Sequence, residues 1–339
     1  MSDPNGDPEF VLPDLTTNNI FFCGIHQIDE PAIVFEAHQF SLPERKELYV
    51  RQCSKVLCFE LITPSAGQLV VVKGIRPIGE RYPQELARNE LLIWRLLNPH
   101  PNIASLLGIA NLNTIYDGCI KPLAVCCYCE GGTPREFMQE RKINSRDRLG
   151  LLMDIAKGVA HIHRQSIVHG DLKADNIVIE TSQGEIIPKV IDFGSSRLAC
   201  SGCRYDYDNK QGGTFQWISP EVRQGKSGWT TQSDIWAFGC VALEVQLDTL
   251  PYTRRGEVPS LQNAFWKQQA NELPAARKDF ESLLSWDVVA SEVWKIIEGC
   301  WGLNPGERPS AEELVINLRQ VEQSTNEFEV LSTLYDWTV

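Results

Sequence analysis

The spacing of apolar residues changes near residue 130, and this change predicts two structurally different parts. Before it, apolar and polar residues alternate over 49–61, a pattern that predicts two β-strands. Further strands are predicted at 69–73, 103–109 and 123–128, and helical spacing of apolar residues predicts one helix at 85–97. The first part should therefore be rich in β-structure.

Helical periodicity dominates the second part. Thr133, Pro134 and Glu136 form a capping box with proline at the first helical position, so a helix is expected to begin there. Further helices are predicted at 149–162, 233–245, 289–301 and 311–321. The first 45 residues are polar and contain five prolines, so we expect an irregular N-terminal extension.

Composition narrows the class of protein without indicating a reaction. The chain has 339 residues, of which 43% are hydrophobic and 22% charged, as in ordinary globular proteins. Its formal net charge of −12 argues against nucleic acid as a partner, because nucleic-acid binding usually needs a basic face. The sequence contains no apolar run of about 18 residues, so no membrane span is predicted, and no secretory signal is visible. We therefore expect a cytoplasmic protein, with the nucleus as the other location.

The chain contains eleven cysteines, and their arrangement favours free thiols. Cys126, Cys127 and Cys129 share one apolar run, where they could hardly pair with each other. Buried thiols in a reducing compartment fit this pattern best. Cys200 and Cys203 form a CxxC with no second pair at ligand spacing nearby, so coincidence is favoured over a zinc or redox site.

Two polar segments carry the strongest chemical signal. The sequence HGDLKADN spans 169–176, and KVIDFG follows at 189–194. Phosphoryl transfer needs a carboxylate that accepts the substrate hydroxyl's hydrogen bond, a cation near the moving phosphoryl group, and oxygen ligands for magnesium. The two segments contain such a set: Asp171, Lys173, Asn176 and Asp192.

These segments resemble the catalytic loop and DFG motif of eukaryotic protein kinases. The resemblance implies that Asp171 is the catalytic aspartate and that Asn176 and Asp192 bind Mg2+, with ATP as the other cofactor. Lys173 is typical of serine/threonine kinases. Thr214 falls where such kinases place a threonine beside the catalytic aspartate, so it completes the predicted catalytic residues.

The resemblance continues through the second half of the chain. Residues 213–221 resemble the substrate loop that ends in APE, and Glu221 should form the family's buried ion pair with Arg308. Residues 233–239 resemble the central helix beneath the catalytic loop. Cys300 and Trp301, followed by Arg308 and Pro309, resemble the sequence found here in the tyrosine-kinase-like and tyrosine kinase groups.

The first half matches the family less closely. Lys73 ends a β-branched run at the position of the family's phosphate-binding lysine. We expect Glu90 to pair with it, with Glu85 as the other candidate. Val71 stands where the family has a small alanine, so it should crowd the adenine.

The resemblance also implies which residues surround the nucleotide. Cys126 occupies the gatekeeper position, and the backbones of Cys127 and Cys129 should meet adenine. The remaining residues expected at the nucleotide, besides Lys73, Glu90 and Asp192, are Val56, Val71, Thr133 and Val178.

The glycine-rich loop departs most from the family. Glycine there lets backbone N–H groups approach the phosphates closely. This chain has no glycine between Gly24 and Gly67, and the three loop positions hold Tyr49, Arg51 and Ser54. The loop could be a poorer lid over ATP, which is the favoured interpretation, or the site could be closed to ATP.

Gly170 replaces the arginine that usually precedes the catalytic aspartate and pairs with an activation-loop phosphate. We therefore predict that the activation loop needs no phosphorylation. The alternative is that Arg197 or Arg204 receives the phosphate instead.

Together these features predict an α+β, two-lobed protein kinase fold. The small first lobe should contain a five-stranded antiparallel sheet and one helix, and the larger second lobe should be mainly helical. The expected organisation is an extension at 1–45, a kinase domain at 46–322 and a tail at 323–339. Within the domain, the lobes are expected at 46–128 and 133–322, joined by a hinge at 127–132.

The favoured function is ATP- and Mg2+-dependent phosphorylation of serine or threonine in protein substrates, with a regulatory protein as a further partner. A pseudokinase that binds partners is the main alternative, supported by the absent glycines and Val71. Phosphorylation of a small molecule is a weaker alternative, because residues 214–221 favour a peptide platform.

Overall fold

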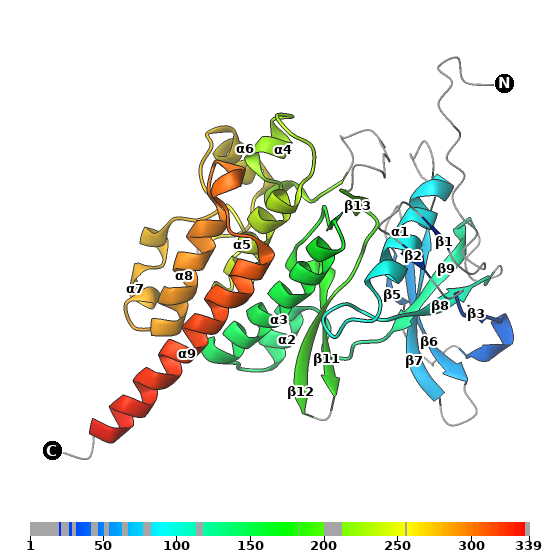
Figure 1. The fold of residues 1–339 in the computed structure, drawn as a ribbon, viewed down its shortest axis with the longest axis horizontal. Helices are drawn as coiled ribbons and strands as arrows, with labels where there is room; N and C mark the ends of the chain where they lie inside the picture. The colour runs from blue at the N-terminus through cyan, green and yellow to red at the C-terminus, as the bar shows by residue number, and fades with distance from the viewer. Residues whose placement is uncertain are drawn as a thin grey trace. The chain divides into compact units, whose positions relative to one another are not determined.

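The computed structural model divides the chain into two compact units, which are described separately (Figure 1). The first unit comprises residues 1–96 and 105–128, and the second comprises 97–104 and 129–339. The structure describes residues 20–21, 27–28, 32–41, 47–50, 54–62, 67–76, 83–112, 118–182, 184–199, 212–254 and 256–335. The predicted division into a β-rich part and a helical part is confirmed.

A mixed sheet forms the first unit. Its strands are β3 (Val34–Phe35), β4 (Phe40–Ser41), β5 (Glu47–Val50), β6 (Ser54–Ile62), β7 (Gly67–Ile75), β8 (Leu106–Ala110) and β9 (Ile120–Cys127). Among the described residues they form a seven-stranded sheet in the order β3-β8-β9-β7-β6-β4, with β5 also paired to β6. β3 and β8 are parallel, whereas the other pairs are antiparallel.

The expectation of a five-stranded antiparallel sheet was therefore wrong. The expected strands exist, but β3 and β4, from the segment predicted as an extension, add to the sheet. A glycine makes the parallel pairing possible: a Cβ at Gly108 would lie 2.3 Å from the carbonyl oxygen of Ile33. That carbonyl accepts a hydrogen bond of 2.8 Å from the N–H of Ile109. Each added strand is two residues long, too short to show a sequence period.

Aromatic contacts attach these short strands to the core. Phe40 and Phe59 pack edge to face with ring centroids 5.6 Å apart, and Phe35 lies 6.1 Å from Phe40. Phe59 belongs to a buried cluster that contains Leu57, Phe59, Leu61, Val70, Val72, Ala110, Leu112, Leu123 and Val125. The helix α1 (Pro83–Leu97), the 3-10 helix Ala37–Gln39, and the separate ladder of β1 (Ile20–Phe21) with β2 (Gln27–Ile28) complete the described elements of this unit.

Helices dominate the second unit. They are α2 (Pro134–Glu140), α3 (Ser145–Arg164), α4 (Pro220–Arg223), α5 (Thr231–Leu247), α6 (Leu261–Gln269), α7 (Glu281–Leu284), α8 (Val288–Cys300) and α9 (Ala311–Tyr335). Two small antiparallel ladders accompany them: β10 (Ile167–Val168) with β13 (Arg197–Leu198), and β11 (Ile177–Ser182) with β12 (Glu185–Val190). The capping box at Thr133 forms as predicted.

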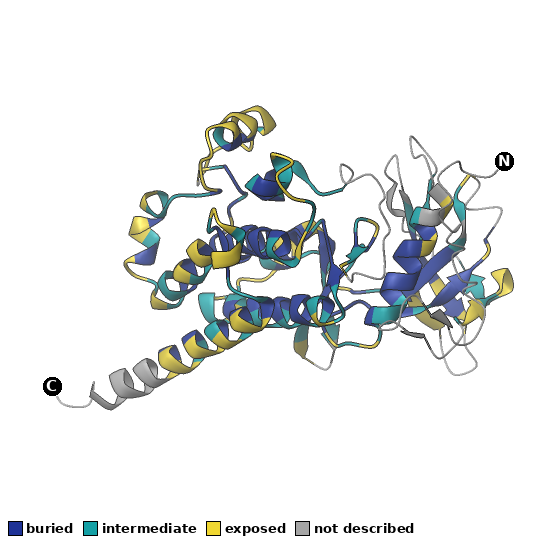
Figure 2. Cartoon of the chain, turned by 45° about the horizontal axis from the view of Figure 1, so that its top comes forward, coloured by how far each residue is buried: buried dark blue, intermediate teal, exposed yellow. Residues whose placement is uncertain are grey.

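The helix α5 is buried on all sides because it is apolar around its circumference. Trp236 and Phe238 are both fully buried. In Figure 2 buried residues gather on the sheet of the first unit and on the inner helices of the second. A helix buried in this way can hold polar groups rigidly, which matters for the site below.

Three further findings bear on the predictions. The strand expected at 103–109 begins only at Leu106, while Ile103 forms an isolated bridge with Val190. The helix expected at 311–321 extends to Tyr335. Within the described part of the chain, no disulfide joins the cysteines, and Cys58, Cys126, Cys129, Cys240 and Cys300 are buried.

None of the helices in the described residues combines the length and apolarity needed to cross a membrane.

Candidate active site

A buried carboxylate on α5 anchors the loop at 169–176. Asp234 is 1% exposed, and its two oxygens accept hydrogen bonds from the N–H groups of His169 (2.8 Å) and Gly170 (3.0 Å). The side chain of His163 also lies 3.0 Å from Asp234. Charged hydrogen bonds of this kind are stronger than neutral ones, so the loop has a rigid base.

Asp171, Lys173 and Thr214 form a closed triangle of hydrogen bonds above that base. The Thr214 hydroxyl donates to Asp171 Oδ1 at 2.7 Å. Lys173 Nζ donates to Asp171 Oδ2 at 2.9 Å and to Thr214 Oγ1 at 2.5 Å. The structure thus brings together three of the four residues predicted to be catalytic, although Thr214 is 43 positions away from Asp171.

Asn176, the fourth, ends the short 3-10 helix Ala174–Asn176 and faces the same aspartate. Its amide nitrogen donates to the carbonyl of Asp171 at 2.7 Å and to Asp171 Oδ2 at 3.1 Å. These bonds orient the side-chain amide and leave its oxygen as the atom that can coordinate a cation.

The segment with Asp192 is joined to the same loop through the backbone. The N–H of Ile191 donates to the carbonyl of Asn176 at 3.0 Å, and His169 Nε2 lies 3.1 Å from the carbonyl of Ile191. Phe193 is fully buried and packs edge to face on His169 at 5.6 Å. Asp192 has a φ of 67°, a left-handed conformation that is uncommon for residues other than glycine.

Asn176 and Asp192 offer an amide oxygen and a carboxylate, the hard oxygen donors that Mg2+ prefers. Within the described ranges, no three His, Cys, Asp or Glu side chains are grouped as a metal site. Proteins usually hold Mg2+ with one or two carboxylates plus water and phosphate oxygens, and the two residues fit that limited role.

A second buried carboxylate, Glu244 near the end of α5, was not predicted from the sequence. Its Oε1 accepts hydrogen bonds from Trp217 Nε1 at 2.8 Å and from the N–H of Ala174 at 3.4 Å. Arg135 approaches its other oxygen at 3.2 Å. Glu244 therefore connects the catalytic loop with the segment that carries Thr214. A lone glutamate within an apolar helix was the available signal.

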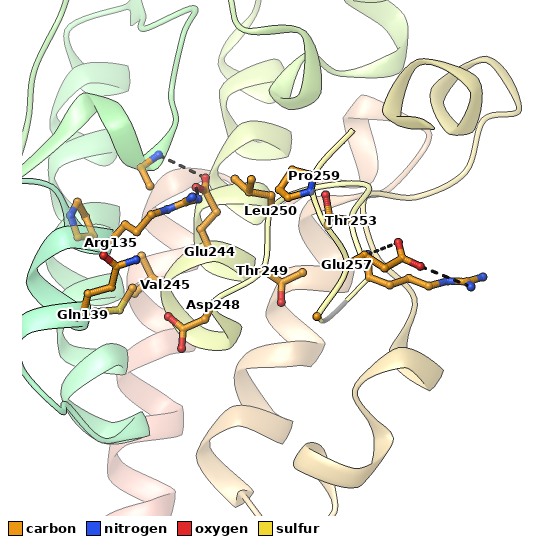
Figure 3. A pocket seen from close by; sticks show the side chains of 15 residues that line it. Arg135, Gln139, Glu244, Val245, Asp248, Thr249, Leu250, Thr253, Glu257 and Pro259 are labelled. Carbon is orange, nitrogen blue, oxygen red and sulfur yellow. Dashed lines mark hydrogen bonds and ion pairs between the residues drawn. The ribbon is translucent and has the colours of Figure 1, made fainter. Parts of the chain in front are cut away.

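Burial raises the pKa of Glu244 to about 7, although Trp217, Arg135 and Ala174 favour the charged form. Glu244 and Arg135 point toward one another in a pocket of about 190 Å3 (Figure 3). The pocket is lined by Pro134, Arg135, Met138, Gln139, Ala174, Glu244, Val245, Asp248, Thr249, Leu250, Thr253, Arg254, Gly256, Glu257 and Pro259.

The predicted ion pair between Glu221 and Arg308 is confirmed. The two Arg308 Nη atoms donate to the two Glu221 oxygens at 2.7 and 2.8 Å, and both residues are buried. Burial favours protonation of Glu221, but hydrogen bonds, above all those from Arg308, outweigh it and lower the pKa. The Arg308 guanidinium also lies 5.1 Å from the centre of the Trp236 ring.

In the first unit, Lys73 pairs with Glu90 as predicted, with Nζ to Oε1 at 2.6 Å. Glu90 lies on α1 and is 3% exposed. The side chain of Glu85, the other candidate, lies outside the described residues.

The other residues expected at the nucleotide of this unit lie on three adjacent strands. Val56 on β6 pairs with Lys73 on β7, and Val71 pairs with Cys126 on β9. Burial raises the pKa of the Cys126 thiol, so this thiol, predicted to be the gatekeeper, is unreactive. The N–H of Cys127 donates to the carbonyl of Ser105 at 3.2 Å, so this N–H is used within the unit.

The second unit holds the remaining three. Thr133 is engaged in its helix cap, since its hydroxyl donates to Glu136 Oε2 at 2.8 Å. Val178 lies on β11 and is half-buried, whereas Cys129 is buried.

Some predictions fall on residues that the structure does not describe. Arg51, Cys200, Cys203 and Arg204 lie outside the described ranges, as do the side chains of Tyr49 and Ser54. The interpretation of the glycine-free loop as a poorer lid over ATP therefore stays a prediction, and so does the interpretation of the CxxC as a coincidence.

Comparison with known proteins gives one consistent result. A family model described as "Protein kinase domain" matches residues 53–317. The serine/threonine/tyrosine-protein kinase HT1 of Arabidopsis thaliana is 28% identical over 250 residues, which cover 72% of this chain and 56% of that protein. The serine/threonine-protein kinase STY46 of the same plant is 26% identical over 270 residues, covering 77% and 41%.

A fungal protein shows the same pattern. The serine/threonine-protein kinase BCK1/SLK1/SSP31 of Saccharomyces cerevisiae is 28% identical over 233 residues, or 68% of this chain and 14% of that protein. The matched region thus spans little more than half of HT1 and smaller parts of the other two relatives.

Proposed function

The chain belongs to the protein kinase domain family, and from this premise we propose that it transfers the γ-phosphate of ATP to serine or threonine in protein substrates, with Mg2+ as cofactor. The single observation that carries the proposal is the triangle of Asp171, Lys173 and Thr214. It joins a carboxylate, a cation and a hydroxyl from two distant segments at 2.5 to 2.9 Å.

Each residue of the triangle has a role that its chemistry supports. Asp171 accepts the hydrogen bond of the substrate hydroxyl and orients it for attack. Lys173 offsets negative charge on the phosphoryl group as it moves. Thr214 holds both residues in place, and this arrangement supports serine or threonine as the acceptor.

Asp192 and Asn176 supply the oxygen donors for Mg2+, which offsets the charge of the phosphates when bound. Lys73, oriented by Glu90, supplies a cation for the α- and β-phosphates in the first unit. The free cysteines support a reducing compartment, the cytoplasm or the nucleus. A regulatory protein partner is part of the proposal by analogy with signalling kinases alone.

A pseudokinase that binds partners is the second candidate function. Its support comes from Tyr49, Arg51 and Ser54 at the three glycine positions, where side chains would limit close contact with phosphate. Val71 also supports the pseudokinase, because it stands where the family has a small alanine and should crowd the adenine.

The test is phosphate transfer to a generic basic protein, measured for the wild type and for Asp171→Asn. The variant keeps the size of the side chain but weakens hydrogen-bond acceptance. We expect transfer to fall by about a hundredfold or more, comparable to other general-base deletions. ATP should still raise the melting temperature of both proteins, because Asp171 acts on the hydroxyl and not on ATP.

Equal transfer by wild type and Asp171→Asn would contradict the catalytic assignment. A wild type that shows neither transfer nor a shift of its melting temperature with ATP would support the pseudokinase.

A further inference from the structure

Arg197, at the start of β13, occupies an unusual position in the second unit. Its two terminal nitrogens face two glycines: a Cβ at Gly170 would lie 3.4 Å from Nη1, and a Cβ at Gly212 would lie 3.3 Å from Nη2. The guanidinium carbon also lies 5.4 Å from the centre of the Trp229 ring. We call Arg197, Trp229, Gly170 and Gly212 the Arg197 cluster.

One side of the Arg197 cluster is bound to the catalytic loop. Arg197 pairs with Val168 in the ladder of β10 and β13. The Ser196 hydroxyl donates to the carbonyl of His169 at 2.9 Å, and the N–H of Ala199 donates to the carbonyl of Ser166 at 2.7 Å. These bonds hold the backbone of Arg197 against the segment that leads to Asp171.

Gly170 has to be glycine for this arrangement to exist. Its φ is +78°, and an added Cβ would lie 2.6 Å from the carbonyl oxygen of Ser195. A side chain at position 170 would therefore collide with the backbone just ahead of Arg197, besides adopting an unfavourable conformation. The observed position of Arg197 therefore depends on the absence of a side chain at residue 170.

The other side of the cluster holds the segment that carries Thr214. Gly212 faces the guanidinium, and a Cβ at Gly213 would lie 2.2 Å from the Trp229 ring. Thr214 follows at once and donates its hydrogen bond to Asp171. Burial lowers the pKa of Arg197 and the charge of Asp234 raises it, but an arginine this basic stays charged.

We propose that Arg197 is a positioning residue for phosphate transfer: stacked with Trp229, its guanidinium holds the Gly212–Thr214 backbone against the catalytic loop and so aligns Thr214 with Asp171 without a phosphate group. In this arrangement a fixed protein cation orders the segment through its own contacts. The inference rests on the proposed function and adds the residue that makes the aligned state independent of phosphorylation.

The test compares Arg197→Ala and Arg197→Lys with the wild type, all treated with phosphatase. Lysine keeps the charge but lacks the planar fork that can face two glycines and stack on an indole. We expect kcat to fall by about 10- to 100-fold in both variants, as for a small misplacement of reacting groups. The KM for ATP should stay unchanged, because Arg197 acts on the alignment of Thr214 and Asp171.

Arg141→Ala is the matched control. Arg141 is exposed and its guanidinium also lies over an aromatic ring, 4.9 Å from the centre of Phe137. Its removal should leave kcat unchanged. A kcat for Arg197→Ala equal to that of the control would overturn the proposal, and so would a wild-type rate that collapses after phosphatase treatment.

A second measurement does not depend on activity. Hydrogen exchange at 212–217 should be about 2- to 30-fold faster in Arg197→Ala than in the wild type, the factor expected for a lost cation–π contact. Trp229→Leu should cause a similar increase. Unchanged exchange in both variants would overturn the proposal, even if the wild type transfers no phosphate and the proposed function itself fails.

Discussion

At the scale of single residues, two buried carboxylates of α5 organise the site in different ways. Asp234 accepts backbone hydrogen bonds from His169 and Gly170, so it anchors the loop that leads to Asp171. Glu244 is 5% exposed, and burial is the largest influence on its pKa. One helix therefore anchors the loop at 169–176 through Asp234 and places a titratable carboxyl group, Glu244, beside it.

The raised pKa of Glu244 predicts a pH-dependent stability. In the unfolded chain this carboxyl has its ordinary pKa of 4.5, whereas in the fold its pKa is about 7. The folded state therefore binds the extra proton between these values, so Glu244 destabilises the fold progressively as the pH rises through that window. A shift of this size corresponds to about 3 kcal/mol in total.

Glu244→Gln should remove this dependence, because glutamine can still accept the hydrogen bond of Trp217 without a charge. The free energy of unfolding, measured with urea at pH 5 and pH 8, should change less between the two pH values in the variant. Glu140→Gln, at an exposed position, is the control for loss of a negative charge. Parallel pH dependence in wild type and Glu244→Gln would contradict the prediction.

At the scale of elements, the ion pair of Glu221 and Arg308 joins α4 to the segment ahead of α9. Arg308 also donates to the carbonyls of Gly302 and Gln232, at 2.8 Å each. Its polar hydrogens are thus distributed among three segments, and the guanidinium stacks beside Trp236 of α5. A single side chain links elements that are far apart in the sequence.

Arg308→Ala should therefore destabilise the second unit strongly. The substitution leaves the Glu221 carboxylate buried without its counter-charge, which typically costs about 3–5 kcal/mol. Thermal or urea unfolding measures the loss. The matched control is Arg164→Ala, because Arg164 pairs with Glu312 at 3.3 Å on the surface, where an ion pair contributes at most about 1 kcal/mol. Equal losses of stability in the two variants would show that the buried ion pair contributes no more than the surface pair.

At the scale of the whole molecule, each unit contains part of the residues proposed to act on phosphate. The first unit carries the pair of Lys73 and Glu90, and the second carries Asp171, Asn176 and Asp192. The proposed roles differ accordingly, since Lys73 is expected to meet phosphate directly and Asp192 to act through Mg2+.

Substitution in each unit should affect ATP binding differently. Asp192→Asn should remove the part of ATP affinity that depends on Mg2+, because a neutral amide is a weaker ligand for a hard cation. Lys73→Met should weaken ATP binding with or without the metal. Calorimetric titration with ATP, in Mg2+ and in EDTA, distinguishes the two patterns. An Asp192→Asn protein that keeps the full response to Mg2+ would show that the metal assignment is wrong.

Local sequence determined much of this fold. Alternating apolar residues predicted β5 and β6, and a β-branched run predicted β7. Helical spacing predicted α1, α3 and α8, because each of these helices has a continuous buried face, whereas α5 was predicted from a long apolar run. Asp171, Lys173, Asn176 and Asp192 could be proposed as a site from the sequence, since they lie in two short segments with fixed spacing. Only the fold places Thr214 beside them.

Tertiary structure alone decided the rest. β3 and β4 are two-residue strands, and their pairing depends on Gly108 and on aromatic contacts with residues distant in the chain. No local period of apolar residues therefore predicts them. Glu244 and Arg197 likewise acquire their positions only when α5, the catalytic loop and the Thr214 segment pack together. Sequence spacing specifies which groups are available, but burial and long-range packing determine what each group contacts and how it ionises.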